Sequence, residues 1–356
     1  MSTKNILFVI DSLGIGGAEK AILTLANFFL NENCNVDIIV CDNIVQFEMP
    51  EQINLHILGF KKSFLDYRKY SHKLEKMISN LQKKYDKDFD LILVHLQKAT
   101  RLIKNHDQTK VYHVVHSTFS QSAFKNKSPL SVFFKKRKLQ NIYNNLNIIT
   151  VSEGIKKDLL DNIQIRPKSI QRIYNPINKD EITSLADEPI ELDDNDYIVH
   201  VGRLAKVKRH DVLLKAFKLA NINAKLILVG DGEEKSNILT LIKELHLEEK
   251  VILKGFQKNP YPYIKNAKLL VLSSEYEGLP TVLLESLILN TPVVSTNCPS
   301  GPNEILSDTL HRCLANVNDV EDLANKIRAN YLHPTLQPRN TTFHYKKIIQ
   351  DYLALC

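Results

Sequence analysis

A regular alternation of short apolar runs with longer amphipathic stretches constrains the fold of this chain more than any other feature. Ile6–Ile10 is an apolar run, Glu19–Leu30 is an amphipathic stretch, and Val36–Val40 is the next apolar run. Short β-branched runs indicate buried strands, whereas apolar residues at helical spacing indicate a helix packed on one side. Because parallel strands need a crossover connection, this rhythm predicts a parallel sheet covered by helices.

The rhythm runs through the chain twice. Its first series continues with Leu91–Val94, Val111–Val115 and Ile148–Val151, and its second comprises Ile198–Val201, Leu226–Val229, Val251–Leu253, Leu269–Leu272 and Val293–Ser295. The acidic segment between them, Asp187–Asp196, lacks apolar periodicity. A chain of 356 residues also exceeds the usual size of one hydrophobic core. We therefore predict an α/β fold with a Rossmann-like domain at 1–175, a linker at 176–196, a second Rossmann-like domain at 197–335, and a C-terminal helix within 336–356.

The cysteines and the N-terminal segment bear on location. The five cysteines are odd in number and form no C-x-x-C pair, which argues against a disulfide framework and against a zinc site. The apolar run Ile6–Ile10 is far shorter than the core of a signal peptide or a membrane span. We therefore expect a cytoplasmic protein that binds no metal.

Positive charge is concentrated in the N-terminal half. Residues 1–175 contain 26 basic and 16 acidic side chains, whereas the remainder contains 21 and 24. A basic half of this kind can bind an anionic lipid or a phosphate-bearing acceptor, or it can serve solubility alone. The sequence has neither zinc-finger spacing nor an aromatic-rich strand motif, which argues against nucleic-acid binding. Lys125 and Lys127 precede Phe133–Lys138, in which two phenylalanines adjoin four cations. We hypothesise a peripheral contact with an anionic membrane surface, the alternative being that Phe133 and Phe134 face the core.

The loop after the first predicted strand is rich in glycine. It runs from Asp11 to Glu19 and contains Gly14, Gly16 and Gly17. Glycines let backbone amides approach a ligand closely, and the start of the following helix favours negative charge. The spacing differs from the dinucleotide fingerprint G-x-G-x-x-G, and a tight turn without a ligand would use the same residues.

Two later segments, each after a predicted strand of the second domain, contain candidate binding residues. Gly202–Lys208 follows the first strand of the second domain and contains Arg203 and Lys208. Cations at the carboxyl end of a strand can bind a diphosphate in place of a metal, although such a run is also typical of a solvated surface. Ser274–Glu285 follows a later strand; Pro280 suits a first helical turn, which puts Glu277 in the preceding loop and Glu285 on the second turn of an apolar helix.

Together these segments resemble the retaining glycosyltransferases of family 4, which have the GT-B fold. The family signature contains two glutamates with seven residues between them, and Glu277 and Glu285 match this pair. Before the glutamates the family has an arginine and a lysine with four residues between them, and Arg203 and Lys208 match these. Three further segments are similar to the family's: Gly16–Glu19, Val151–Ile155 and Asn175–Pro176. The resemblance implies two Rossmann-like domains facing a central cleft, with the last helix crossing back to the first domain.

The resemblance also implies roles for individual residues. Glu277 would lie near the transferred sugar, and His116 would contact that sugar from the first domain. Residues expected to bind the donor are Gly16, Gly17, Arg203, Lys208, Gly278, Leu279, Thr281 and Glu285. Among these, Glu285 would accept hydrogen bonds from the ribose, and the two cations would hold the diphosphate. For Glu304 two roles stay open: capping of the following helix and participation in the site.

The implied activity is that of a metal-independent, retaining hexosyl- or N-acetylhexosaminyltransferase without a cofactor. Its donor would be a UDP-sugar or a GDP-sugar, and its acceptor a glycan or a lipid-linked glycan of lipopolysaccharide, O-antigen or capsule, reached from the inner face of the cytoplasmic membrane. A sugar-nucleotide 2-epimerase on a similar fold is the alternative. The Asp-x-Asp pairs within Asp86–Asp90 and at Asp194–Asp196 lie away from the carboxyl ends of strands, so we interpret them as solvated turns and not as a metal site.

Overall fold

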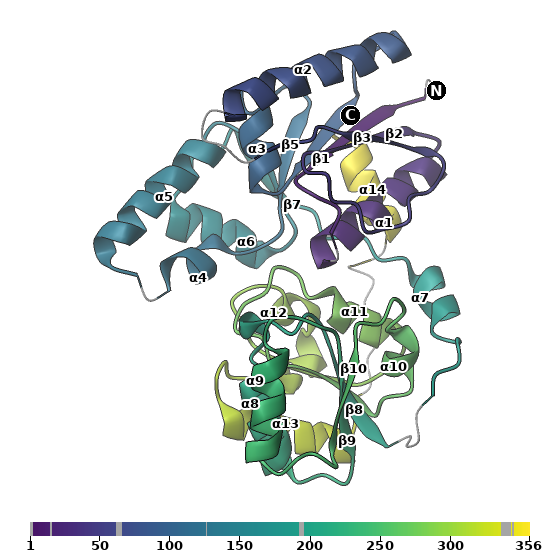
Figure 1. Cartoon of the computed structure of the whole chain (residues 1–356), viewed down its shortest axis with the longest axis vertical. Coiled ribbons are helices and arrows are strands. Elements are labelled where there is room, and N and C mark those ends of the chain that lie inside the picture. The colour runs from purple at the N-terminus through teal and green to yellow at the C-terminus, as the bar shows by residue number, and fades with distance from the viewer. Residues whose placement is uncertain are drawn as a thin grey trace. The chain divides into compact units, whose positions relative to one another are not determined.

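The computed structural model describes residues 3–14, 16–61, 66–125, 127–191, 196–335, 343 and 345–356. The chain divides into two compact units, one formed by Met1–Pro176 with Phe343–Cys356 and the other by Ile177–Thr342 (Figure 1). Each unit is built around one parallel sheet with helices between its strands. The predicted α/β fold with two Rossmann-like domains is therefore confirmed.

The sheet of the first unit has the strand order β3-β2-β1-β4-β5-β6-β7. Its strands are β1 (Asn5–Ile10), β2 (Asn35–Val40), β3 (Ile53–Ile57), β4 (Leu91–His95), β5 (Val111–Val115), β6 (Asn147–Thr150) and β7 (Ser169–Arg172). All six strand pairs are parallel. Every residue of β1 is buried, which explains its continuous apolar sequence, because a parallel strand covered by helices on both faces has no solvent-facing side.

Seven α-helices belong to the described part of this unit. They are α1 (Gly17–Asn31), α2 (Asp66–Tyr85), α3 (Gln97–Ile103), α4 (Phe119–Phe124), α5 (Pro129–Tyr143), α6 (Glu153–Lys157) and α14 (Tyr345–Leu353). The last of them packs on α1: the ring of Tyr345 stacks on Phe28 at 4.6 Å between centroids, and Tyr352 meets Phe29 edge-on at 6.3 Å. Residues 336–342 and 344, which precede this helix in the predicted C-terminal segment, lie outside the described residues.

The sheet of the second unit has the order β10-β9-β8-β11-β12-β13. Its strands are β8 (Tyr197–Val201), β9 (Lys225–Val229), β10 (Val251–Gly255), β11 (Leu269–Leu272), β12 (Val293–Thr296) and β13 (Leu314–Ala315). Its α-helices are α7 (Lys179–Leu185), α8 (His210–Ala220), α9 (Lys235–Glu244), α10 (Tyr261–Lys265), α11 (Thr281–Ile288), α12 (Pro302–Ile305) and α13 (Val320–Leu332). The buried apolar faces of α8 and α13 meet over this sheet in one hydrophobic cluster.

Helix α7 lies within the segment expected to be a linker. Its first turn is capped by Asn178, whose Oδ1 accepts a hydrogen bond from the Glu181 N–H at 3.2 Å, and Asp180 adds a second acidic group there. Ile182 is its one buried residue, so apolar periodicity could not indicate this helix. Residues 192–195 of the expected linker lie outside the described residues.

The strand orders decide which loops are neighbours. In the first unit β1 lies next to β4 and β4 next to β5, whereas in the second unit β8 lies next to β11. Because parallel strands end at the same edge of a sheet, the loops that follow these strands come together. Within the described residues, no helix has the length and hydrophobicity needed to cross a bilayer.

Candidate active site

In the second unit, Lys208 and Glu277 form an ion pair although they lie far apart in the sequence. Lys208 ends a short 3₁₀ turn, Lys206–Lys208, in the loop after β8, and Glu277 lies in the loop after β11. The Lys208 Nζ is 2.6 Å from Glu277 Oε1, and the Ser274 hydroxyl donates to the same oxygen at 2.5 Å. The two charged side chains are only 18% and 14% exposed. This cluster therefore combines a partly desolvated cation with a carboxylate at the binding edge of the sheet.

Hydrogen bonds to backbone carbonyls hold the loops of this cluster together. The Glu275 N–H donates to the carbonyl of Val207 at 2.8 Å, and the Ser273 hydroxyl donates to the carbonyl of Lys208 at 2.7 Å. The Ser300 hydroxyl in turn donates to the carbonyl of Gly278 at 2.7 Å. The loop after β11 is thus attached to both neighbouring loops, which fixes where Glu277 and Gly278 lie.

Arg203, the other predicted diphosphate ligand, lies in a different setting. Its Nη2 is 3.0 Å from Glu233 Oε2, and the two side chains are 70% and 53% exposed. An exposed pair of this kind contributes little to stability, so the guanidinium can exchange Glu233 for another anion at small cost. Its planar fork of donors suits a phosphate.

Helix α11 begins directly after this loop and contains Glu285. The residue before it, Pro280, offers no side-chain cap, so the helix start retains the partial positive charge of free backbone N–H groups. Gly278 and Leu279 lead into this start, and Thr281 is the first helical residue. Glu285 lies on the second turn and is only 7% exposed, among buried neighbours of the same helix. A carboxylate at such a depth is retained only where polar groups satisfy it.

Two buried histidines, which the sequence analysis missed, adjoin Lys208. The rings of His200 and His210 meet edge-on with centroids 4.7 Å apart. His200 Nδ1 is 2.9 Å from the carbonyl oxygen of Val271 and donates to it, leaving Nε2 as an acceptor. Burial, and secondarily the charge of Lys208, lowers the pKa of His210 to about 4. Burial likewise lowers the pKa of His200 well below its ordinary value, so both imidazoles are neutral near pH 7 and add no competing charge beside the lysine.

In the first unit, the glycine loop and Asp11 lie at the edge formed by β1 and β4. Asp11 accepts backbone hydrogen bonds from Ala99 at 2.7 Å and Lys98 at 3.2 Å, so it caps the start of α3. Gly16 precedes α1 and Gly17 begins it; a methyl group on Gly17 would meet nothing within 4 Å. Burial raises the pKa of Asp11, despite these two hydrogen bonds.

His116 follows β5 and pairs with a second histidine. Its Nε2 is 2.9 Å from Nδ1 of His95, the last residue of β4. Burial lowers the pKa of His116 to about 4, and burial, with smaller contributions from His116 and His113, lowers the pKa of His95 well below its ordinary value. A neutral His116 cannot act as a cation; its Nε2 faces His95, and its Nδ1 is buried without a hydrogen-bond partner in the described part of the chain. His95 was missed because a histidine at the end of an apolar run reads as part of the core.

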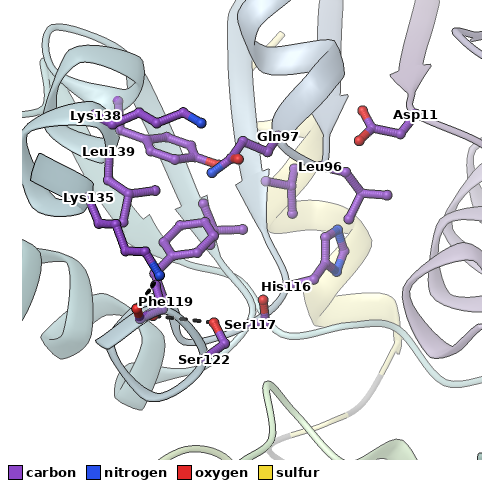
Figure 2. A pocket seen from close by; sticks show the side chains of 14 residues that line it. Asp11, Leu96, Gln97, His116, Ser117, Phe119, Ser122, Lys135, Lys138 and Leu139 are labelled. Carbon is purple, nitrogen blue, oxygen red and sulfur yellow. Dashed lines mark hydrogen bonds between the residues drawn. The ribbon is translucent and has the colours of Figure 1, made fainter. Parts of the chain in front are cut away.

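A pocket of about 500 Å³ opens beside His116 (Figure 2). Asp11 and Gln97 line it from the edge of the sheet, and Lys135 and Lys138 line it from α5. The Lys135 ammonium donates to the carbonyl of Ala123 at 2.8 Å. The pocket combines hydroxyl, amide and ammonium donors, which suits a sugar or a phosphate.

The Asp-x-Asp segments occupy structural positions where they are described. Asp90 accepts a hydrogen bond from the backbone of Asn5 at 2.8 Å and one from Lys87 at 2.9 Å, and Asp88 accepts one from Gln82 at 2.9 Å. Asp194 and Asn195, in the remaining segment, lie outside the described residues. Within the described chain, histidine, cysteine and acidic side chains form no group of three or more arranged to bind a metal.

Because of the buried histidines, we expect the folded protein to lose stability against unfolding in mild acid. The pKa values of His113, His116 and His210 are lowered to about 3, 4 and 4, so the unfolded chain, whose histidines titrate near 6.5, binds protons that the folded chain excludes. Stability is therefore complete above about pH 6.5 and falls as the pH drops toward 4, by up to about 1.4 kcal/mol per pH unit for each histidine. Urea unfolding at several pH values measures this slope.

Two variants provide the controls for this slope. His210→Gln is expected to flatten it for the second unit, whereas His72→Gln, at an exposed position on α2, is expected to leave it unchanged. A slope that His210→Gln does not alter would contradict the assignment to buried histidines.

Comparisons with known proteins decide the family. The family model described as Glycosyl transferases group 1 matches residues 183–341, and the model described as Glycosyltransferase Family 4 matches residues 15–181. Over 361 aligned residues the chain is 30% identical to the N-acetylgalactosamine-N,N'-diacetylbacillosaminyl-diphospho-undecaprenol 4-alpha-N-acetylgalactosaminyltransferase of Campylobacter jejuni, with 97% of each chain covered. The chain belongs to glycosyltransferase family 4.

Two further comparisons agree with this assignment. The glycosyltransferase is 29% identical to the lipopolysaccharide 1,6-galactosyltransferase of Escherichia coli over 195 residues, which cover 52% of this chain and 53% of the other. It also superimposes on the crystal structure of Anabaena HepE in complex with UDP and glucose, with a TM-score of 0.73 and 18% identity over 99% of this chain and 98% of that one. The predicted GT-B fold and the predicted glycosyltransferase activity are confirmed.

Proposed function

We propose that this glycosyltransferase transfers a hexosyl or N-acetylhexosaminyl residue from a UDP-sugar or GDP-sugar to a lipid-linked glycan, with retention of configuration, during synthesis of a surface polysaccharide. The observation that supports the donor site best is the cluster of Lys208, Glu277 and Ser274 at the carboxyl ends of β8 and β11. The acceptor class is inferred from relatives whose names include a diphospho-undecaprenol-linked glycan and lipopolysaccharide.

The proposed roles in the second unit follow from charge and position. Lys208 and Arg203 bind the diphosphate, and Glu285 accepts hydrogen bonds from the ribose. The backbone N–H groups of Gly278, Leu279 and Thr281 approach the phosphates or the sugar, because they surround the uncapped start of α11. Glu277 lies near the transferred sugar and keeps Lys208 in place until the donor arrives.

The bond that breaks joins the anomeric carbon to the diphosphate, so negative charge grows on the departing phosphate. Fixed cations near that phosphate stabilise the transition state more than the ground state. We therefore propose that the reaction proceeds without a catalytic metal. From the first unit, His116 is proposed to contact the sugar, and Gly16 and Gly17 to leave room for the donor.

A thermal-shift screen against UDP-, GDP-, ADP- and CDP-sugars, with a chelator present, tests the donor site. We expect one UDP-sugar or GDP-sugar to raise the melting temperature, because a ligand that binds only the folded state stabilises it by mass action. The same sugar should support transfer in chelator at an undiminished rate. Activity that disappears in chelator and returns with magnesium or manganese would reject metal independence.

We further propose that α5 rests on an anionic membrane surface. Leu130, Phe133 and Phe134 lie at helical spacing on one face of α5 and are 67%, 54% and 63% exposed. Phe133 and Phe134 thus do not face the core, which removes the alternative considered for them. Four consecutive cations, Lys135–Lys138, follow on the same helix. Exposed aromatics beside cations are typical of a helix that lies in the interface of an anionic bilayer.

Sedimentation with vesicles tests this contact. The wild-type enzyme is expected to pellet with phosphatidylglycerol vesicles at low salt and to be released by high salt, and Phe133→Ser/Phe134→Ser to lose most of the binding. Phe256→Ser is the control, because Phe256 is 52% exposed in the second unit. Vesicle binding that is insensitive to salt, and equal in Phe133→Ser/Phe134→Ser and Phe256→Ser, would contradict the proposal.

A further inference from the structure

A second cavity in the first unit, a groove between α3 and α5, is strongly cationic. Its volume is about 480 Å³, and it is lined by Arg101, Lys104, Phe134, Arg137, Lys138, Asn141 and Ile142. Lys104 donates to the carbonyl of Asn141, which holds the two helices side by side. Four of the seven lining residues are cations and none is acidic. We call this feature the α3–α5 groove.

The cations of the groove have no acidic partner among the residues that the structure describes. Arg101 stacks on the ring of Tyr67, with 3.8 Å from the guanidinium carbon to the ring centroid, and Arg137 lies 5.9 Å from the ring centroid of Phe133. Stacking on a ring orients a guanidinium but leaves its N–H edges free to donate. Lys104 uses one of its three ammonium protons on Asn141. Four positive charges around one groove repel each other unless an anion binds between them.

The neighbourhood of the groove indicates which anion it binds. Lys138 lines both the groove and the pocket beside His116, so the two cavities adjoin. Phe134 also lines the groove and is 63% exposed, on the face of α5 proposed to rest on the membrane. Around the circumference of α5 the order is therefore an exposed apolar face, then the cations of the groove, then the residues that line the pocket. A lipid-linked acceptor has the same order of lipid, diphosphate and sugar.

We propose that the α3–α5 groove binds the diphosphate of a lipid-linked acceptor, while the acceptor sugar extends into the pocket beside His116. This inference rests on the proposed function, in which the acceptor is lipid-linked. The guanidinium of arginine donates paired hydrogen bonds to two phosphate oxygens. A diphosphate also has enough negative charge to neutralise several cations at once, whereas a single carboxylate does not. The donor diphosphate is assigned to Lys208 and Arg203 in the other unit, so the two diphosphates use separate sites.

The test compares two acceptors with the same glycan, one attached to its lipid through a diphosphate and the other through an uncharged ether, both in neutral detergent. In the triple variant Arg101→Gln/Lys104→Gln/Arg137→Gln we expect the KM for the diphosphate acceptor to rise at least tenfold. The KM for the uncharged acceptor, kcat and the donor thermal shift should stay unchanged. Lys76→Gln/Lys83→Gln/Lys84→Gln, which removes the same charge from exposed positions on α2, is the matched control.

Three results would overturn the inference. If both acceptors lose affinity equally, the groove does not recognise the diphosphate. If the control triple variant has the same effect as the groove variant, only the overall charge matters. If the groove variant loses binding to anionic vesicles but keeps its KM for the diphosphate acceptor in detergent, the groove recognises phospholipid headgroups instead. Failure of the proposed function is distinguishable, because the wild-type enzyme would then show no donor shift and no transfer to either acceptor.

Discussion

Lys208→Ala lowers kcat/KM for the nucleotide sugar by about two to three orders of magnitude, the cost typical of removing one preorganised group that stabilises transition-state charge. Lys208 is the cation held closest to Glu277 and is only 18% exposed, so water cannot easily replace it. Its loss also leaves Glu277 with the hydroxyl of Ser274 but without its ammonium partner. Steady-state kinetics with the donor identified in the thermal-shift screen measures the effect.

Lys206→Ala is the matched control for this variant. Lys206 begins the same 3₁₀ turn but is exposed, and no role in the site is assigned to it. We expect its kinetics to stay within about twofold of the wild type, as is usual for surface substitutions away from a site. Equal losses in Lys206→Ala and Lys208→Ala would indicate a general effect of loop charge and would count against the proposed diphosphate site.

Gly230→Ala is expected to destabilise the second unit by roughly 3 kcal/mol, from backbone strain and overpacking together. Gly230 follows β9 with a φ of +145°, and a β-carbon there would lie 1.9 Å from the carbonyl oxygen of Gly202. The loop that contains Arg203 would have to move, and small displacements of positioning groups can cost about a hundredfold in rate. Urea unfolding and donor kinetics measure the two effects.

The control for Gly230→Ala is Gly255→Ala. Gly255 ends the neighbouring strand β10 and also has a positive φ, of +71°, but a β-carbon there would meet nothing within 4 Å. Gly255→Ala therefore reports backbone strain without the collision, and we expect it to cost about 1 to 2 kcal/mol with donor kinetics intact. If the two variants behave alike, the close approach of the loops after β8 and β9 is unimportant.

The fold could be predicted from the sequence because its strands are buried and apolar while its helices are amphipathic. Ile6–Ile10 and Leu269–Leu272 were placed as strands from these patterns, and the structure has them as β1 and β11 within one residue. The loop position of Glu277 and the second-turn position of Glu285 likewise follow from Pro280, which suits a helix start. These features depend on local sequence alone.

What the sequence could not provide depends on tertiary contacts. The partner of Lys208 is 69 residues away, and the pairing follows from the adjacency of β8 and β11. His95, His200 and His210 lie in or beside apolar segments, where the sequence alone indicates a core residue. Their histidine neighbours become evident only from the tertiary structure. Helical spacing also could not distinguish an exposed Phe133 from a buried one, because either face of α5 offers apolar residues.

The measurement that tests the central claim most directly is a transfer assay in chelator, with the responding nucleotide sugar and a lipid-diphosphate-linked glycan, followed by mass spectrometry and NMR of the product. The account predicts that the acceptor gains one hexose or N-acetylhexosamine whose anomeric configuration is that of the donor. Conversion of the donor to its 2-epimer without any gain in acceptor mass would contradict it and would support the epimerase alternative.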